Sequence, residues 1–135
     1  MTHGPNPDDE LLRLIAKQRK IYDRIGLVGC PIIKSRKKVR FNIKGFRHLH
    51  IDGQDKYRTK NIATVRLELL QYAVGVVEHC KILKTDIYEA SETSSGKSET
   101  YYNLYARVGP RQIRVMATIR IVGGGDPHFY GIRRD

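Results

Sequence analysis

Three histidines stand close to arginines in two separate stretches of the sequence. His48 and His50 precede Arg58 in the stretch 46–60, and His128 lies near the carboxyl end. Cleavage of RNA without a metal ion requires a base for the 2′-hydroxyl proton, an acid for the leaving 5′-oxygen and cations for the phosphorane oxygens. Histidine titrates near neutral pH and suits the first two tasks, and arginine suits the third. These residue types therefore indicate acid–base chemistry on a phosphodiester.

The segment 112–122 alternates with a period of two and adds arginines to the candidates. One face of this expected strand is apolar, and the other carries Arg114, Met116, Thr118, Arg120 and Val122. A buried, unpaired guanidinium is costly, so these arginines should face either a wet cleft or a carboxylate such as Asp86 or Glu89 on a neighbouring strand. We expect a phosphate contact, with Arg120 the stronger candidate.

The next segment should bring more polar groups to the same face. Residues 123–126, Gly-Gly-Gly-Asp, favour a hairpin turn after the arginine strand. In the strand that follows, Phe129 should point into the core, while His128 and Tyr130 point to the face that carries Arg120. Tyr130 would then position a substrate beside the arginines.

The first histidine stretch also permits two other interpretations. If the chain is extended there, His48 and His50 share a face with Asp52, a spacing that could hold a metal ion. No second cluster of cysteine, histidine or carboxylate supports such a site, and the sequence has no H-E-x-x-H motif. The stretch could also be a solvated basic loop. We predict no metal ion and no cofactor.

The overall charge favours a polyanionic partner. Lysine and arginine total 25 against 14 acidic residues, a formal net charge of +11. Such an excess increases encounter rates with nucleic acid and supplies the sequence-independent part of its affinity. A membrane surface is the competing partner, but no segment has the apolar face of an interfacial helix, so we expect no membrane binding. The residues expected to bind nucleic acid outside the catalytic set are Lys38, Arg40, Arg47, Lys56, Lys60, Arg114 and Thr118.

Hydrophobic periodicity predicts helices first and strands later. We expect a helix over 8–24, a short strand at 38–41, a turn at Gly45, and a helix over 59–80 that Gly75 breaks or kinks. A polar loop is expected over 91–98. The expected strands are 82–89, 101–108, 112–122 and 129–132. The predicted fold class is α+β, with helices packed on one face of a twisted, four-stranded antiparallel sheet.

The chain length predicts one compact domain in two parts. Residues 1–36 form an N-terminal helix and a basic linker, and residues 37–135 form the core that carries every candidate residue. The two cysteines form no C-x-x-C pair, and the first ten residues do not resemble a hydrophobic signal. We therefore expect a cytoplasmic protein.

The order of these elements resembles the barnase, EndoU, colicin D and RelE-like group of small ribonuclease domains. The segments 39–48, 113–120 and 128–132 carry the resemblance, which covers roughly residues 37–133. It implies endonucleolytic cleavage of RNA, such as transfer or messenger RNA, by a toxin or a phage-associated nuclease. It also implies an acidic antitoxin or immunity protein as partner. The functional positions that it implies are His48, Arg58, Arg120 and Tyr130. Gly131 departs from the pattern, because such domains often place a hydroxyl residue there.

Two functions from different classes follow from the sequence. The first is a metal-independent endoribonuclease in which His48 or His50 shares the acid–base roles with His128, while Arg58 and Arg120 bind the phosphate. The second is a non-catalytic RNA- or DNA-binding module that uses the same basic face, with tyrosines as stacking platforms.

Overall fold

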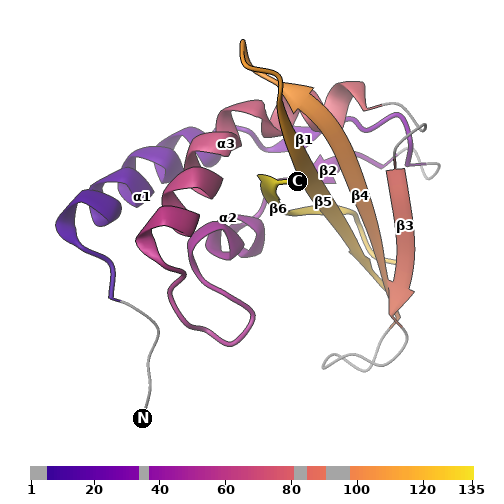
Figure 1. Ribbon diagram of the computed structural model, residues 1–135. Helices are drawn as coiled ribbons and strands as arrows, with labels where there is room; N and C mark the ends of the chain where they lie inside the picture. Colours follow the sequence, from indigo (N-terminus) through magenta and orange to yellow (C-terminus); the bar gives the residue numbers. More distant parts are fainter. Residues whose placement is uncertain (1–5, 34–36, 81–84, 91–97) are drawn as a thin grey trace.

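The computed structural model describes residues 6–33, 37–80, 85–90 and 98–135, with only the backbone for 85–90. Outside these residues lie the first positions of the strand predicted from Ile82 and all of the loop predicted over 91–98 except Ser98. The elements follow the chain in the order α1 (Asp9–Tyr22), β1 (Leu27–Val28), β2 (Val39–Arg40), α2 (Ile43–His50), α3 (Lys60–His79), β3 (Thr85–Ala90), β4 (Glu99–Val108), β5 (Ile113–Val122) and β6 (His128–Arg134) (Figure 1).

The fold class is α+β, as the sequence predicts, but the sheet is larger than predicted. Strands β3 to β6 form the expected antiparallel meander, and β1 and β2 extend it to six strands in the order β1-β2-β6-β5-β4-β3. The sheet is mixed, because β2 pairs with β6 in parallel at Arg40 and His128. A purely antiparallel, four-stranded sheet was therefore a wrong prediction. Of the two added strands, β2 lies within the strand predicted at 38–41, whereas β1, with two residues, is too short to show a periodicity.

Helices α1 and α2 lie on one side of the strands, and α3 runs from beside them past β5 and β4 toward β3 (Figure 1). Asp8 caps α1 by accepting a hydrogen bond from the Leu11 amide at 2.8 Å, and Thr59 caps α3. Helix α3 is continuous through Gly75, so the predicted break is absent. Among the described residues, no helix has the length and apolar character needed to cross a membrane.

The segment that holds the first two histidines is the helix α2, and this corrects two predictions. Asn42 caps it by accepting a hydrogen bond from the Gly45 amide, so Gly45 lies inside a helix and forms no turn. His48 and His50 then point to different sides instead of sharing a face with Asp52. The buried positions Phe46, Leu49 and His50 recur at helical spacing, a signal that the short length of the segment concealed.

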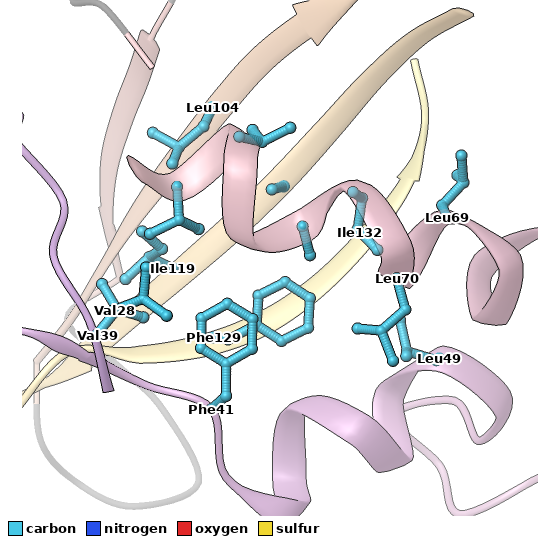
Figure 2. Close-up of a cluster of buried hydrophobic side chains, with 14 of the residues drawn as sticks. Val28, Val39, Phe41, Leu49, Leu69, Leu70, Leu104, Ile119, Phe129 and Ile132 are labelled. Atoms are coloured by element: carbon cyan, nitrogen blue, oxygen red, sulfur yellow. The ribbon is translucent and has the colours of Figure 1, made fainter. Parts of the chain in front are cut away.

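A single core joins the N-terminal segment to the sheet (Figure 2). The rings of Phe41 and Phe129 stack with centroids 4.6 Å apart. Tyr22, which ends α1, packs against both rings and donates a hydrogen bond to the Asn42 carbonyl oxygen at 2.7 Å. Val28 of β1 belongs to the same cluster. Residues before 37 therefore contribute to the core beneath the candidate site.

Helix α2 packs directly against the backbone of β6, and a glycine permits this. A Cβ atom at Gly45 would stand 2.1 Å from the Phe129 carbonyl oxygen and 2.9 Å from the Tyr22 hydroxyl. No other residue fits there without separating the two elements. This close approach brings the next turn of α2, which carries His48, to the residue after Phe129.

A β-bulge in β6 turns two consecutive residues away from the core. Ile119 pairs with Phe129 and Thr118 pairs with Gly131, so Tyr130 is the extra residue. Phe129 and Ile132 are both buried in the core, and the bulge leaves Tyr130 and Gly131 together on the opposite face. That face is where the candidate site lies.

Candidate functional site

Two adjoining pockets meet at His48 and Tyr130, whose ring centroids are 4.1 Å apart. The first, here called the α3 pocket, has a volume of about 390 Å³ and contains Arg58, Arg66 and Arg133. The second, the α2 pocket, has a volume of about 260 Å³. Its charged lining residues besides His48 are Lys44, Arg47, Asp52, Asp55 and Arg120. Together the pockets form a groove with more basic than acidic side chains.

Arg58 is fixed beside His48 by the backbone. Its Nε atom donates a hydrogen bond to the His48 carbonyl oxygen at 2.9 Å, and its amide donates to the His50 carbonyl oxygen at 2.8 Å. The loop between α2 and α3 is held by Asp52, whose carboxylate accepts hydrogen bonds from the amides of Gln54 and Lys56. Arg58 can therefore present its terminal nitrogens to the α3 pocket without reorganising the backbone.

Arg120 is held by a carboxylate that the sequence analysis did not single out. Its Nη2 atom forms an ion pair with Glu99, the first residue of β4, which is only 4% exposed. The Tyr101 hydroxyl also donates a hydrogen bond to Glu99. An ion pair was one of the two outcomes predicted for Arg120, with Asp86 or Glu89 as the expected partner. The structure does not describe the side chains of these two acids, and the partner that it shows is Glu99. Arg120 nevertheless lines the α2 pocket, with its guanidinium 5.4 Å from the Tyr130 ring centroid.

His48 has the environment of a neutral base. Its partial burial lowers its pKa below the ordinary 6.5, and the positive charges of Arg58, Arg66 and Arg120 lower it further. At neutral pH the imidazole is uncharged and can accept a proton. It lines both pockets, so it is accessible from either side of the groove.

His128 lies close to this groove but lines neither pocket. Its ring centroid is 6.4 Å from that of Tyr130, so His48 and His128 flank the same ring. Burial, together with the charges of Arg120 and Lys44, lowers the pKa of His128 to about 4. Its Nε2 atom is enclosed and has no hydrogen-bond partner among the described residues, and the same holds for Nε of Arg120. A direct contact between this imidazole and a substrate would require a rearrangement.

His50 points into the protein. It is 7% exposed and packs against the rings of Phe46 and Tyr57. Burial lowers its pKa to about 4, and its Nδ1 atom has no partner among the described residues. Of the two neighbouring histidines that the sequence left as alternatives, only His48 faces the groove.

The residues predicted to bind nucleic acid are distributed unevenly. Arg47 lines the α2 pocket, and Thr118 lines the α3 pocket, where its hydroxyl donates a hydrogen bond to the Asn103 side-chain oxygen at 2.9 Å. Lys60 pairs with Asp8 and Glu10 of α1, and Arg114 pairs with Asp135. The remaining three, Lys38, Arg40 and Lys56, line neither pocket.

Three basic lining residues were missed by the sequence analysis, and a signal existed for each. Arg66 lies next to Leu67 at the border of the buried stripe of α3, where a basic side chain is unusual. Arg133 follows the buried Ile132, and alternation places it on the open face. Lys44 lies one turn before His48 on α2, which was not predicted as a helix.

Among the described residues, no three histidine, cysteine or acidic side chains are close enough together to hold a metal ion. Comparison of the chain with protein-family models, with curated proteins and with solved structures found no match.

Proposed function

We propose that the protein is an endoribonuclease that cleaves RNA by attack of a 2′-hydroxyl group on the adjacent phosphate, using its own side chains. The observation that supports this most strongly is the position of His48 at the junction of the two basic pockets, with Arg58 and Arg120 on either side. A phosphodiester bound across this junction meets one neutral imidazole and two guanidinium groups.

The environment of each group suggests its role. His48, whose lowered pKa keeps it neutral, takes the proton of the 2′-hydroxyl. Arg58 and Arg120 hold the phosphate and stabilise the charge of the phosphorane. The groove offers Tyr130 as the donor of a proton to the leaving oxygen, because this residue lines both pockets whereas Nε2 of His128 is enclosed. His128 then acts as a positioning residue behind Tyr130 and Arg120.

The carboxylate of Glu99 holds Arg120 in this arrangement. Buried and paired with Arg120, it has a pKa held below its ordinary value by the hydrogen bonds from Arg120 and Tyr101. It restricts the guanidinium to one position, and because Nε is enclosed, only the terminal nitrogens of Arg120 can contact a ligand. An acidic inhibitor protein is a second partner that the charge of the groove would fit.

A cleavage assay in excess EDTA tests the proposal. We expect RNA to be cut to products with 2′,3′-cyclic phosphate ends and an all-DNA oligonucleotide to stay intact, because attack needs the 2′-hydroxyl. His48→Ala should lower kcat by roughly 10²- to 10⁴-fold, the usual contribution of general acid–base catalysis. Arg111→Gln, which removes a positive charge from an exposed turn outside both pockets, should leave the rate unchanged.

The enclosure of His128 favours a second candidate, a non-catalytic RNA-binding module. Of the three histidines considered, only His48 lines the groove, so the structure places one imidazole there and not a pair. RNA that stays intact over long incubation, yet binds with an affinity that falls steeply with salt, would favour the module and contradict the enzyme. Cleavage that EDTA abolishes would contradict the roles assigned above.

A further inference from the structure

The α3 pocket gathers three arginines from three elements. Arg58 comes from the loop before α3, Arg66 from the second turn of α3, and Arg133 from β6. None of them forms an ion pair with a carboxylate among the described residues. Lys60, by contrast, pairs with Asp8 and Glu10 at the start of α1. The pocket therefore holds positive charge that the protein itself leaves uncompensated.

This grouping costs free energy in the absence of a ligand. Burial, together with the charges of Arg58 and Arg133, lowers the pKa of Arg66 to about 10. Burial also lowers the pKa of Arg58. A bound anion would relieve this repulsion, and the fork of a guanidinium matches the oxygens of a phosphate.

The rest of the pocket has the character of a site for a nucleotide. Met116 and Ile132 give it apolar surface, and the amide of Asn103 is oriented by the hydroxyl of Thr118. The space beside Gly131 is open, since an added Cβ there would meet no atom within 4 Å. The volume of about 390 Å³ is within the range of small-molecule sites.

We infer that the α3 pocket is a subsite for the nucleotide next to the cleaved linkage, in which Arg66 and Arg133 bind its phosphate. The inference rests on the proposed function for the identity of its ligand, an RNA strand. It implies that the enzyme reads two successive phosphates, one at His48 and one in the α3 pocket. A substrate with a single phosphate would leave the arginines of the pocket unpaired and would be cleaved poorly.

Binding of a short 2′-O-methyl RNA tests the subsite without cleavage, because the methyl group blocks attack by the 2′-oxygen. One linkage at a time is replaced by an uncharged methylphosphonate. We expect one such replacement to lower the affinity of the wild type about tenfold, as the loss of a charged hydrogen-bonding partner does. In Arg66→Gln the same replacement should have a smaller effect, because one of the two arginines that bind this phosphate is already absent.

Two further variants complete the cycle. Arg133→Gln, at an exposed position where no folding defect is expected, should show a similarly reduced response to the same linkage. Arg111→Gln removes the same charge outside the pocket and should keep the full response. If both Arg66→Gln and Arg133→Gln still respond like the wild type, the subsite is refuted. The same conclusion would follow if inorganic phosphate alone bound as tightly as the oligonucleotide, since the pocket would then be a site for the free ion.

The outcomes also separate this inference from the proposed activity. If the protein does not cleave RNA but shows the phosphate-specific response, the subsite is supported and the enzymatic role is contradicted. If the protein cleaves RNA through His48 but lacks that response, the activity is supported and the subsite is contradicted.

Discussion

At the scale of single residues, the central feature is a histidine kept neutral among cations. His48 contacts the ring of Tyr130 and lies near three arginines, all of which disfavour its protonated form. A bound phosphate would reverse this effect, because its negative charge raises the pKa of a nearby imidazole. Proton transfer from the 2′-hydroxyl would thus become easier once the substrate occupies the groove.

The pH dependence of the reaction distinguishes Tyr130 from His128 as the acid. A histidine base must be neutral, so kcat/KM should rise with pH and reach a plateau near or below pH 6.5, and with no histidine as the acid it should stay level to pH 8. If His128, with a pKa of about 4, were the acid, kcat/KM would fall about tenfold per pH unit between pH 7 and 8. Initial rates on a fluorogenic RNA at constant ionic strength provide the measurement.

A substitution at His128 provides the control for this profile. His128→Gln should lower the rate by disturbing Tyr130 and Arg120, while the shape of the profile stays unchanged. If the wild-type profile instead declined at high pH and the decline were absent in His128→Gln, His128 would be the acid.

Residue types were the part of the site that the sequence predicted best. Strand alternation placed Arg120 and Thr118 on one face, and the groove contains both. The same reasoning missed Glu99, because a buried acid at the start of a strand is recognised only when the partner strand and its register are known. The sequence could not distinguish His48 from His50 either, because the two side chains have the same chemistry and only their burial in the fold differs.

At the scale of elements, the position of α2 against β6 determines the site. Gly45 allows the helix to contact the Phe129 backbone, and the bulge at Tyr130 turns that ring out toward His48. Periodicity predicted α1, α3 and β3 to β6, which are long enough to show it. It also predicted the short strand at 38–41 that contains β2, but it did not predict α2 and β1, because an eight-residue helix and a two-residue strand are stabilised by tertiary contacts more than by local pattern.

A pair of glycine-to-alanine substitutions tests the contact between α2 and β6. Gly45→Ala places a methyl group within 2.1 Å of the Phe129 carbonyl oxygen, so the free energy of unfolding should fall by about 1–3 kcal/mol and kcat/KM should fall as His48 moves. Gly75→Ala lies in the exposed middle of α3, where an added Cβ meets nothing, and should raise stability by about 0.5–1 kcal/mol.

Urea unfolding of both variants at neutral pH provides the comparison. Effects of opposite sign are expected although both substitutions add one methyl group to a helix. Equal effects would mean that α2 does not approach β6 as closely as described.

At the scale of the whole molecule, positive charge limits stability. The chain carries a net charge of +11 at pH 7 and concentrates part of it around one groove. Tyr22, Val28 and Phe129 join the N-terminal segment to the sheet beneath this groove, so a single core must offset the repulsion. Any protonation that only the unfolded chain accepts will weaken the fold further.

Acidification should therefore destabilise the protein well before its carboxylates titrate. In the folded protein, burial lowers the pKa of His50 to about 4, whereas in the unfolded chain this histidine has its ordinary pKa near 6.5. Between these two values the unfolded state binds more protons, so the free energy of unfolding falls as the pH is lowered, by up to about 1.4 kcal/mol per pH unit for this residue. His128 acts in the same direction. Above pH 6.5 the contribution of both residues is complete.

Two leucine substitutions separate this effect from general charge repulsion. His50→Leu removes a buried imidazole whose Nδ1 atom has no partner among the described residues, and unfolding in urea at pH 7, 6 and 5 should show a shallower loss of stability than in the wild type. His79→Leu removes a histidine whose side chain is 80% exposed, and its slope should match the wild type. If the His50→Leu slope also matched, the acid sensitivity would come from repulsion among the basic side chains, and His50 would titrate as an ordinary solvated histidine.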